Sequence, residues 1–517
     1  MPPTYTVQIT FDRAKNLPVA DIGTLSCDPY VLASLVAPDA EPLKFRTPTI
    51  RRTRDPTWNS TWFVAGVPAA GFKLSMILYD EDPGPKLSPD RLGKAVARFG
   101  PEQMREGFES RETEYVLQKR KGDLHPYILT YLTALIPGEK LRKHNRVVVS
   151  VRVLRKDADQ SEGRMYTLGP NRYSRHFSPL VGSVVNTKPS ANETDANASD
   201  AQTDGRGTKL SATTFIANKL QLTGPVPRAL RHRYVGYRPF IKWMFDDSGL
   251  AGRLLNLGLR RQYRIIYACD KSTVWGAVDD SGANSSNAAT PQGEENKEVR
   301  EGPALRDATP ESMEALARQF LDMTAWGEGA KLFTYVITLD GEWRFTETGP
   351  EFCIDLLSKH SMHADLAKEI AYSGEFFVRP LDSKPEPEPS RNPKDYELVI
   401  DNDSGTYRPK KELLPVLEKW LADDRRLGGL GKVRAMDGFD KGLEEMKEER
   451  KKEKEELTGK GKGKGAAPAR MVPVRSGTSV SSISSGQIGA ESVSSEEVEG
   501  ALKEMEENQG AKEKEKS

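Results

Sequence analysis

The sequence predicts a multi-domain protein, in which an all-β antiparallel sandwich is followed by an α+β domain and a disordered charged tail. The chain has 517 residues, more than a single hydrophobic core usually holds. Short runs of alternating polar and apolar residues fill its first part, whereas strand and helix patterns are mixed in the middle. The last part is rich in Lys, Glu, Gly and Ser and poor in apolar residues.

Residues 1–157 have the pattern of antiparallel strands. Tyr5, Val7, Ile9 and Phe11 alternate with polar residues, which is the period of a strand buried on one side. Four further β-branched or aromatic runs are separated by loops rich in Pro, Gly, Asp and Asn: PYVLASLV, STWFVAGV, FKLSMILYD and RVVVSVRVL. This succession predicts a β-sandwich.

The remaining chain divides by composition. We expect residues 158–209 to be a linker with a low-complexity insertion, because SANETDANASDAQTDGRG contains almost no apolar residue. Residues 210–440 predict an α+β domain with a flexible insertion at about 281–302, since PESMEALARQFLDM reads as a helix and two strands flank Asp340-Gly341. Residues 441–460 predict a charged helix, and 461–517 a disordered tail.

Composition excludes several classes of protein. Lys and Arg total 76 and Asp and Glu total 75, so the net charge of +1 gives no general attraction to nucleic acid. Three cysteines without a CxxC pattern argue against a disulfide framework and favour a reducing compartment. No secretory signal is visible, and no apolar run approaches the roughly 18 residues of a membrane span. We expect a cytoplasmic protein whose membrane association is peripheral.

Five aspartates lie in two loops of the predicted sandwich. Asp21 and Asp28 flank a Gly-bearing loop, and Asp80, Asp82 and Asp90 crowd YDEDPGPKLSPDRLG. Loops after alternate strands emerge at the same end of a sandwich, so the two loops can converge. Calcium binds about six to eight oxygen atoms, largely from carboxylates and carbonyls, so such a convergence suits it. The alternative is a rim of solvated turn residues, since Asp, Pro and Gly are common in turns.

Together, DPYV after an acidic loop, DPTWN in mid-domain and DED followed by DRLG resemble the C2 domain. This family is the calcium-dependent phospholipid-binding β-sandwich of protein kinase C and synaptotagmin, and the resemblance covers roughly the first 155 residues. It implies an antiparallel sandwich of eight strands with calcium as cofactor. It also implies that the five aspartates are the calcium ligands.

The resemblance implies calcium-dependent recruitment to anionic phospholipid membranes, in signalling or trafficking. Bound calcium would cancel the carboxylate charge and offer coordination positions to a lipid phosphate. Ile22, Leu25 and Leu87 lie near the expected loop tips, where they would insert shallowly into the headgroup region. Single exposed apolar residues are common, which is the alternative explanation for them.

A second lipid site is predicted along KFRTPTIRRTR. Lys44, Arg46 and Arg51 resemble the lysine-rich concave strand with which some C2 domains bind phosphoinositides, although Pro48 stands where a lysine is often found. Each basic residue beside an anionic leaflet contributes about 1 kcal/mol, so three aligned residues would matter. A solvated strand face is the alternative.

The α+β domain contains no recognisable catalytic motif. GxSxG, GxxxxGK[ST], HExxH and a dinucleotide fingerprint are all missing from the sequence, so we expect no enzyme. His360 and His363 form an HxxH, which without a clear third ligand indicates ordinary side chains. The whole chain loosely resembles C2-headed proteins of filamentous fungi whose second domain has no assigned activity.

We therefore expect the second domain to be an interaction module with a protein partner of unknown identity. Two alternatives stay open. One is a calcium-independent protein-interaction scaffold. The other is a lipid-directed enzyme whose site in the second domain is built from scattered residues.

Overall fold

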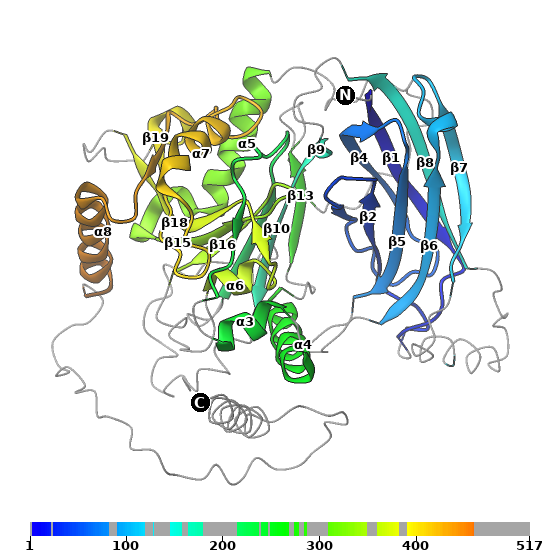
Figure 1. The fold of residues 1–517 in the computed structure, drawn as a ribbon, viewed down its shortest axis with the longest axis horizontal. Helices are drawn as coiled ribbons and strands as arrows, with labels where there is room; N and C mark the ends of the chain where they lie inside the picture. Colours follow the sequence, from blue (N-terminus) through cyan, green and yellow to red (C-terminus); the bar gives the residue numbers. More distant parts are fainter. Residues whose placement is uncertain are drawn as a thin grey trace, which may run out of the picture.

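The computed structural model contains two folded units, a β-sandwich and a second unit built on a large sheet (Figure 1). It describes residues 3–21, 24–81, 90–118, 128, 145–157, 164–178, 215–236, 239–246, 249–267, 273–278, 284–286, 309–348, 359–381 and 390–459. The predicted fold class, an antiparallel sandwich followed by an α+β unit, is confirmed.

The sandwich consists of a five-stranded sheet with the order β7-β8-β1-β4-β9 and a four-stranded sheet with the order β3-β2-β5-β6. All of its strand pairs are antiparallel. The strands are β1 (Thr4–Lys15), β2 (Pro29–Val36), β3 (Leu43–Arg46), β4 (Thr57–Pro68), β5 (Phe72–Asp80), β6 (Arg91–Phe99), β7 (Glu109–Val116), β8 (Arg146–Lys156) and β9 (Tyr166–Gly169).

Alternation along the strands produces the core between the two sheets. Val7, Ile9 and Phe11 of β1 are fully buried, as expected for every second residue of a strand with one face inward. The Phe45 ring of β3 lies 5.2 Å from the Phe11 ring and 5.1 Å from the Trp62 ring of β4. These aromatic contacts join the two sheets.

The predicted linker, residues 158–209, contains two strands. β9 pairs with β4 and adds a ninth strand to the sandwich, where eight were expected, and β10 (Asn171–Ser178) belongs to the sheet of the second unit. β9 is short, and β10 carries several polar residues, so their pattern resembles a loop. Tertiary pairing, which the local pattern does not reveal, makes them strands.

The second unit has a nine-stranded sheet with the order β14-β13-β10-β11-β16-β15-β18-β19-β20. Its pairs are antiparallel except β19 with β20, which are parallel and are connected through α7. β12 (His232–Arg233) and β17 (Glu369–Ile370) form a separate pair. The remaining strands are β11 (Phe215–Gln221), β13 (Val274–Val278), β14 (Asn284–Ser286), β15 (Phe333–Ile337), β16 (Glu342–Glu347), β18 (Tyr372–Pro380), β19 (Tyr396–Asp401) and β20 (Lys432–Met436).

Helices cover both faces of this sheet. Tyr335 of β15 packs in the core cluster that includes residues of α5 and α7, whereas the next residue, Val336, packs in the cluster of α3, α4 and α6. The helices are α3 (Pro239–Asp246), α4 (Gly249–Ile266), α5 (Pro310–Met323), α6 (Lys359–His363), α7 (Leu414–Leu421) and α8 (Lys441–Gly459). Short 3-10 turns occupy Pro101–Gln103, Ala325–Ala330, Pro393–Asp395 and Lys411–Leu413.

The two units contact each other through β10 and β3. Arg172 of β10 donates hydrogen bonds to the carbonyl oxygen of Arg46, at 3.1 Å, and to Oγ of Ser60, at 2.6 Å. Its guanidinium lies 4.2 Å from the centre of the Phe45 ring. Burial lowers the pKa of Arg172 to about 9. A basic side chain of the second unit is thus enclosed against the sandwich.

Helix α8, predicted as a charged helix, packs on the second unit through a buried ion pair. Lys447 Nζ lies 2.6 Å from Oδ2 of Asp401 and 2.8 Å from Oε2 of Glu375. Burial alone would lower the pKa of Lys447, but the charges of Asp401 and Glu375 raise it above its usual value. Burial raises the pKa of Asp401, and Lys447 opposes this rise. Lys447 is therefore the counter-charge that permits Asp401 to be buried.

The substitution Lys447→Met is expected to lower the free energy of unfolding of the second unit by about 3 kcal/mol, because it leaves Asp401 buried without a counter-charge. Hydrogen exchange of the β18 and β19 amides in the full chain measures this change. Lys451→Met on the same helix is the control, since Lys451 is exposed. Equal exchange in the two variants would contradict the role given to Lys447.

Candidate functional site

The loops that carry the predicted ligands lie at one end of the sandwich. β1 ends at Lys15 and β2 begins at Pro29, whose Cα partner in the sheet is Asp80, the last residue of β5. The loops after β1 and β5 therefore leave the sandwich together, at its lower end in Figure 1. This convergence was predicted from the sequence.

Hydrogen bonds donated by backbone N–H groups place three of the five aspartates side by side. The backbone N–H of Asp28 donates to Oδ1 of Asp80 at 2.5 Å. The N–H of Asp80 donates to the carbonyl oxygen of Asp90 at 2.8 Å, and the N–H of Glu81 donates to the carbonyl oxygen of Asp28 at 2.9 Å. Asp28 and Asp80 are buried, at 4% and 0% exposure. The structure thus brings Asp28, Asp80 and Asp90 together.

Asp21 lies close to the same group. It forms an isolated bridge with Ser26, and its N–H donates to the carbonyl oxygen of Ser26 at 3.0 Å. The thiol of Cys27 is buried beside this bridge, and the nearby negative charges affect its pKa. Burial raises the pKa of Cys27 well above its usual value, and the charges of Asp80, Asp21 and Asp28 raise it further.

The remaining predicted loop residues give less information. Asp82, Ile22 and Leu87 lie outside the described residues. Leu25 is half-buried and has a positive φ of 50°, within the short turn before Ser26. Its insertion into a membrane stays a prediction.

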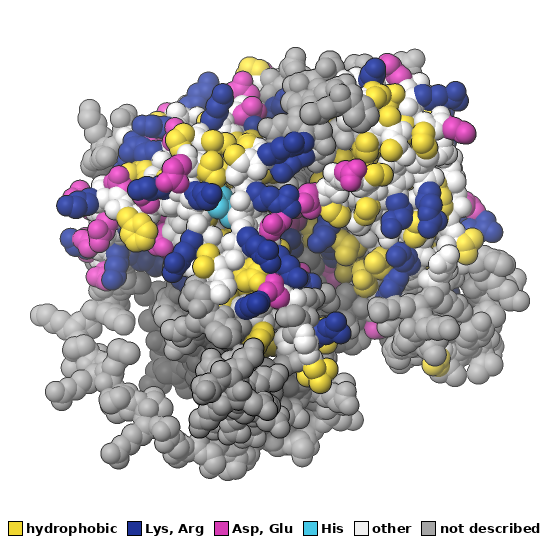
Figure 2. Space-filling view, viewed as in Figure 1, with side chains coloured by type: hydrophobic (Ala, Val, Ile, Leu, Met, Phe, Trp, Pro, Cys, Tyr) yellow, Lys and Arg dark blue, Asp and Glu magenta, His cyan; other side chains and the backbone are white. Residues whose placement is uncertain are grey.

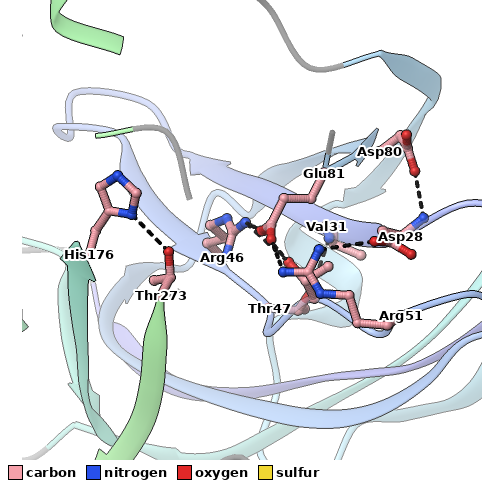
Figure 3. Close-up of polar contacts among 10 residues, drawn as sticks. Asp28, Val31, Arg46, Thr47, Arg51, Asp80, Glu81, His176 and Thr273 are labelled. Atoms are coloured by element: carbon pink, nitrogen blue, oxygen red, sulfur yellow. Dashed lines mark hydrogen bonds and ion pairs between the residues drawn. The ribbon is translucent and has the colours of Figure 1, made fainter. Parts of the chain in front are cut away.

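An arginine occupies the centre of this acidic region. Arg51 Nη1 lies 3.0 Å from Oδ2 of Asp28, and its other terminal nitrogen pairs with Glu81 (Figure 3). Arg46 Nη2 lies 2.7 Å from the second oxygen of Glu81. Burial tends to lower the pKa of Arg51, but the neighbouring Glu81 and Asp28 more than offset this and raise it. The protein thus supplies a cation of its own to Asp28.

The predicted phosphoinositide residues are placed differently from one another. The guanidinium of Arg46 lies between the rings of Tyr30, at 3.8 Å, and Trp275 of the second unit, at 4.1 Å. Arg46 and Arg51 therefore make internal contacts, whereas the side chain of Lys44 is exposed. The structure does not align the three side chains on one open surface. Their contact with lipid stays a prediction.

Glu81 is the site residue that the sequence analysis missed. Its side chain is only 4% exposed, and it joins the acidic loop to both arginines. A signal was present in the sequence, because alternate residues of an extended segment point to opposite sides. The Glu81 carboxylate is therefore expected on the opposite side of the chain from that of Asp80.

The histidines of the HxxH pattern are held by protein groups in the second unit. His360 Nε2 is 3.1 Å from the carbonyl oxygen of Gly374. Nδ1 of His363 contacts the Tyr267 hydroxyl. Nε2 of the same ring lies 3.1 Å from Oγ1 of Thr346. Burial lowers the pKa of His360 to about 4 and that of His363 well below its usual value. Both rings are neutral core side chains.

The described residues contain neither a ready metal-binding group nor a membrane-spanning helix. Within this part of the chain, no three His, Cys, Asp or Glu side chains form a group placed to hold a metal ion. None of the described helices combines the length and the apolar character required to span a bilayer.

One family model matches the N-terminal part of the chain. The family model of the C2 domain matches residues 5–113. Among solved structures, a C2 domain of plant Extended Synaptotagmin 1 is 17% identical, with 30% of this chain and 97% of that chain covered and a TM-score of 0.22. A comparison with curated protein sequences found no match.

Two larger structures match over part of their length. Extended-Synaptotagmin 2, in a structure of its SMP domain and two C2 domains, is 10% identical, with 31% of this chain and 29% of that chain covered and a TM-score of 0.21. Human GIVD cytosolic phospholipase A2 is 19% identical, with 34% of this chain and 21% of that chain covered and a TM-score of 0.22. The match covers less than a third of either protein's own length.

The substitution Arg51→Met is expected to destabilise the sandwich, because it leaves Asp28 without its arginine partner. Arg51 is 29% exposed, so we expect about 2 kcal/mol, less than for a fully buried pair. Hydrogen exchange of the β2 and β5 amides measures the change without added metal. Arg52→Met, at the exposed neighbouring position, should have no effect. Similar losses in both variants would contradict this role of Arg51.

Proposed function

We propose that this chain binds anionic phospholipid membranes peripherally and that calcium controls the binding, because residues 5–113 match the family model of the C2 domain. The contact surface is the end of the sandwich that carries Asp28, Asp80 and Asp90. The observation that carries the proposal is the set of hydrogen bonds from backbone N–H groups that holds these three residues together.

The types of donor suit calcium, although no three side chains of the described residues are placed as a metal-binding group in this structure. Carboxylates and carbonyl oxygens are the ligands this hard cation takes, and its coordination geometry is adaptable. Asp21, Asp28, Asp80 and Asp90 would supply such oxygens, with Asp82 as the fifth predicted ligand. When bound, calcium would supply positive charge and a coordination position for a phosphate oxygen.

The charged residues of the chain would determine how the loops interact with an anionic membrane before calcium binds. Without added cation, clustered carboxylates repel an anionic lipid surface, so they hold the loops away from it. Glu81 adds little to this repulsion, because Arg46 and Arg51 neutralise it. Arg51 also pairs with Asp28 and would have to share this carboxylate with a bound metal ion.

The same arginine favours a second candidate function, binding that is independent of calcium. Arg51 already provides positive charge where Asp28 would otherwise need a metal ion. In that case the sandwich would contact lipid or a protein partner in a fixed state. No catalytic step belongs to either function. The second unit is proposed as an interaction module, and the protein as cytoplasmic until it is recruited.

Co-sedimentation of the full chain with anionic vesicles tests the proposal. The vesicles contain phosphatidylcholine and about 30% phosphatidylserine. With calcium the wild type should pellet, and with EGTA it should pellet much less. Asp80→Asn should remove the calcium-dependent fraction, because it removes a ligand charge while keeping the side chain's shape.

Asp39→Asn is the matched control, since Asp39 is exposed in the loop between β2 and β3, away from the acidic loops. It should behave like the wild type. If calcium and Asp80→Asn both leave pelleting unchanged, calcium control is refuted and the calcium-independent function is favoured.

Calcium binding is also measurable without lipid. A ligand that binds only the folded state raises the unfolding temperature in proportion to the logarithm of its concentration. We expect calorimetry of the wild type and of Asp39→Asn to show this rise with added calcium, and Asp80→Asn to show a much smaller one. An unfolding temperature that does not depend on calcium in the wild type would rule out the metal site.

A further inference from the structure

Helix α4 exposes a stripe of leucines. Leu250, Leu254 and Leu257 are 80%, 56% and 64% exposed. Their spacing of four and three residues places them on one face of the helix. Seven large apolar side chains are exposed among the described residues, and these three are the only ones that share a helix. Such a contiguous stripe is typical of an interaction surface.

The stripe is not the face with which α4 packs on its own unit. Tyr263 is buried in the core cluster with α3 and α6, and Leu255 and Leu259 pack against this cluster. Asn256 is buried and donates a hydrogen bond to the carbonyl oxygen of Met244 in α3. The helix is thus anchored on one side and presents its leucines on the other.

The charge of α4 indicates the partner. The helix sequence, GLAGRLLNLGLRRQYRII, contains Arg253, Arg260, Arg261 and Arg264 and no acidic residue. Arg253 is exposed next to the leucines. A basic helix with an exposed apolar stripe fits the boundary between headgroups and acyl chains of an anionic bilayer.

The position of α4 agrees with this partner. Figure 1 shows α4 at the lower edge of the second unit and the acidic loops at the lower end of the sandwich. In the same view, hydrophobic and basic side chains lie next to one another over the lower part of the second unit (Figure 2). In this view both elements lie toward the same side of the molecule.

We propose that α4 is a second membrane-binding element, which inserts Leu250, Leu254 and Leu257 into an anionic lipid surface without calcium. A second copy of this chain fits less well, because a symmetric contact would bring the arginines of one helix against those of the other. The proposal does not rest on the calcium site. It assigns a membrane contact to the second unit, beyond the sandwich.

The double variant Leu254→Ser/Leu257→Ser tests the insertion in the full chain. Vesicles with about 30% phosphatidylserine, assayed in EGTA, report only the membrane contact that does not need calcium. We expect the variant to bind about tenfold more weakly than the wild type, since two inserted leucines are lost. Phe439→Ser is the control, because Phe439 is 93% exposed but lies between β20 and α8.

The charge requirement is tested separately. Arg253→Glu should weaken binding to these vesicles, and the wild type should bind vesicles of phosphatidylcholine alone much more weakly. Failure of the wild type to bind phosphatidylserine vesicles in EGTA, or equal binding by wild type and double variant, would overturn the proposal.

The outcomes separate this inference from the calcium proposal. Asp80→Asn should keep the EGTA-resistant binding, and the leucine variant should keep a calcium-dependent increase. A leucine variant that changes from dimer to monomer in sedimentation velocity, with unchanged vesicle binding, would identify the stripe as a self-interface. That result would refute α4 as a membrane element while leaving the calcium proposal intact.

Discussion

One buried carboxylate connects the functional end of the sandwich to the rest of the molecule. Glu81 follows the last residue of β5 and pairs with both Arg46 and Arg51. Arg51 continues to Asp28 in the acidic loops, and Arg46 continues to Trp275 in the second unit. A buried carboxylate is costly without counter-charges. Glu81 therefore fixes both arginines and, through them, joins the acidic loops to the contact between the units.

This arrangement explains why basic residues near a predicted lipid site need not bind lipid. Arg46 and Arg51 are engaged with acidic and aromatic groups, so the positive charge beside the loops is largely used within the protein. Helix α4 in the second unit carries four arginines, of which Arg253 is exposed. The proposed membrane surface thus combines acidic loops that respond to calcium with a basic apolar helix that does not need it.

Local sequence patterns predicted those strands and turns whose own residues carry the signal. The alternation of Val7, Ile9 and Phe11 predicted β1, and Asp340-Gly341 predicted the turn between β15 and β16. β9 and β10 were assigned to a linker, because they become strands only by pairing with distant segments. Helix α4 was not recognised, although its leucine spacing and its arginines were a visible signal.

For the candidate site, the sequence by itself determined the chemistry: carboxylates in two loops of an antiparallel sandwich, which strand connectivity places at one end. Only the tertiary structure decided their partners. The ion pair of Arg51 with Asp28, the burial of Glu81 and the stacking of Arg46 on Trp275 join residues far apart in the chain. The residue types and the local periodicity predict which charged groups are available at the site. Only the packing of the two units determines which of these charges are already neutralised by a partner.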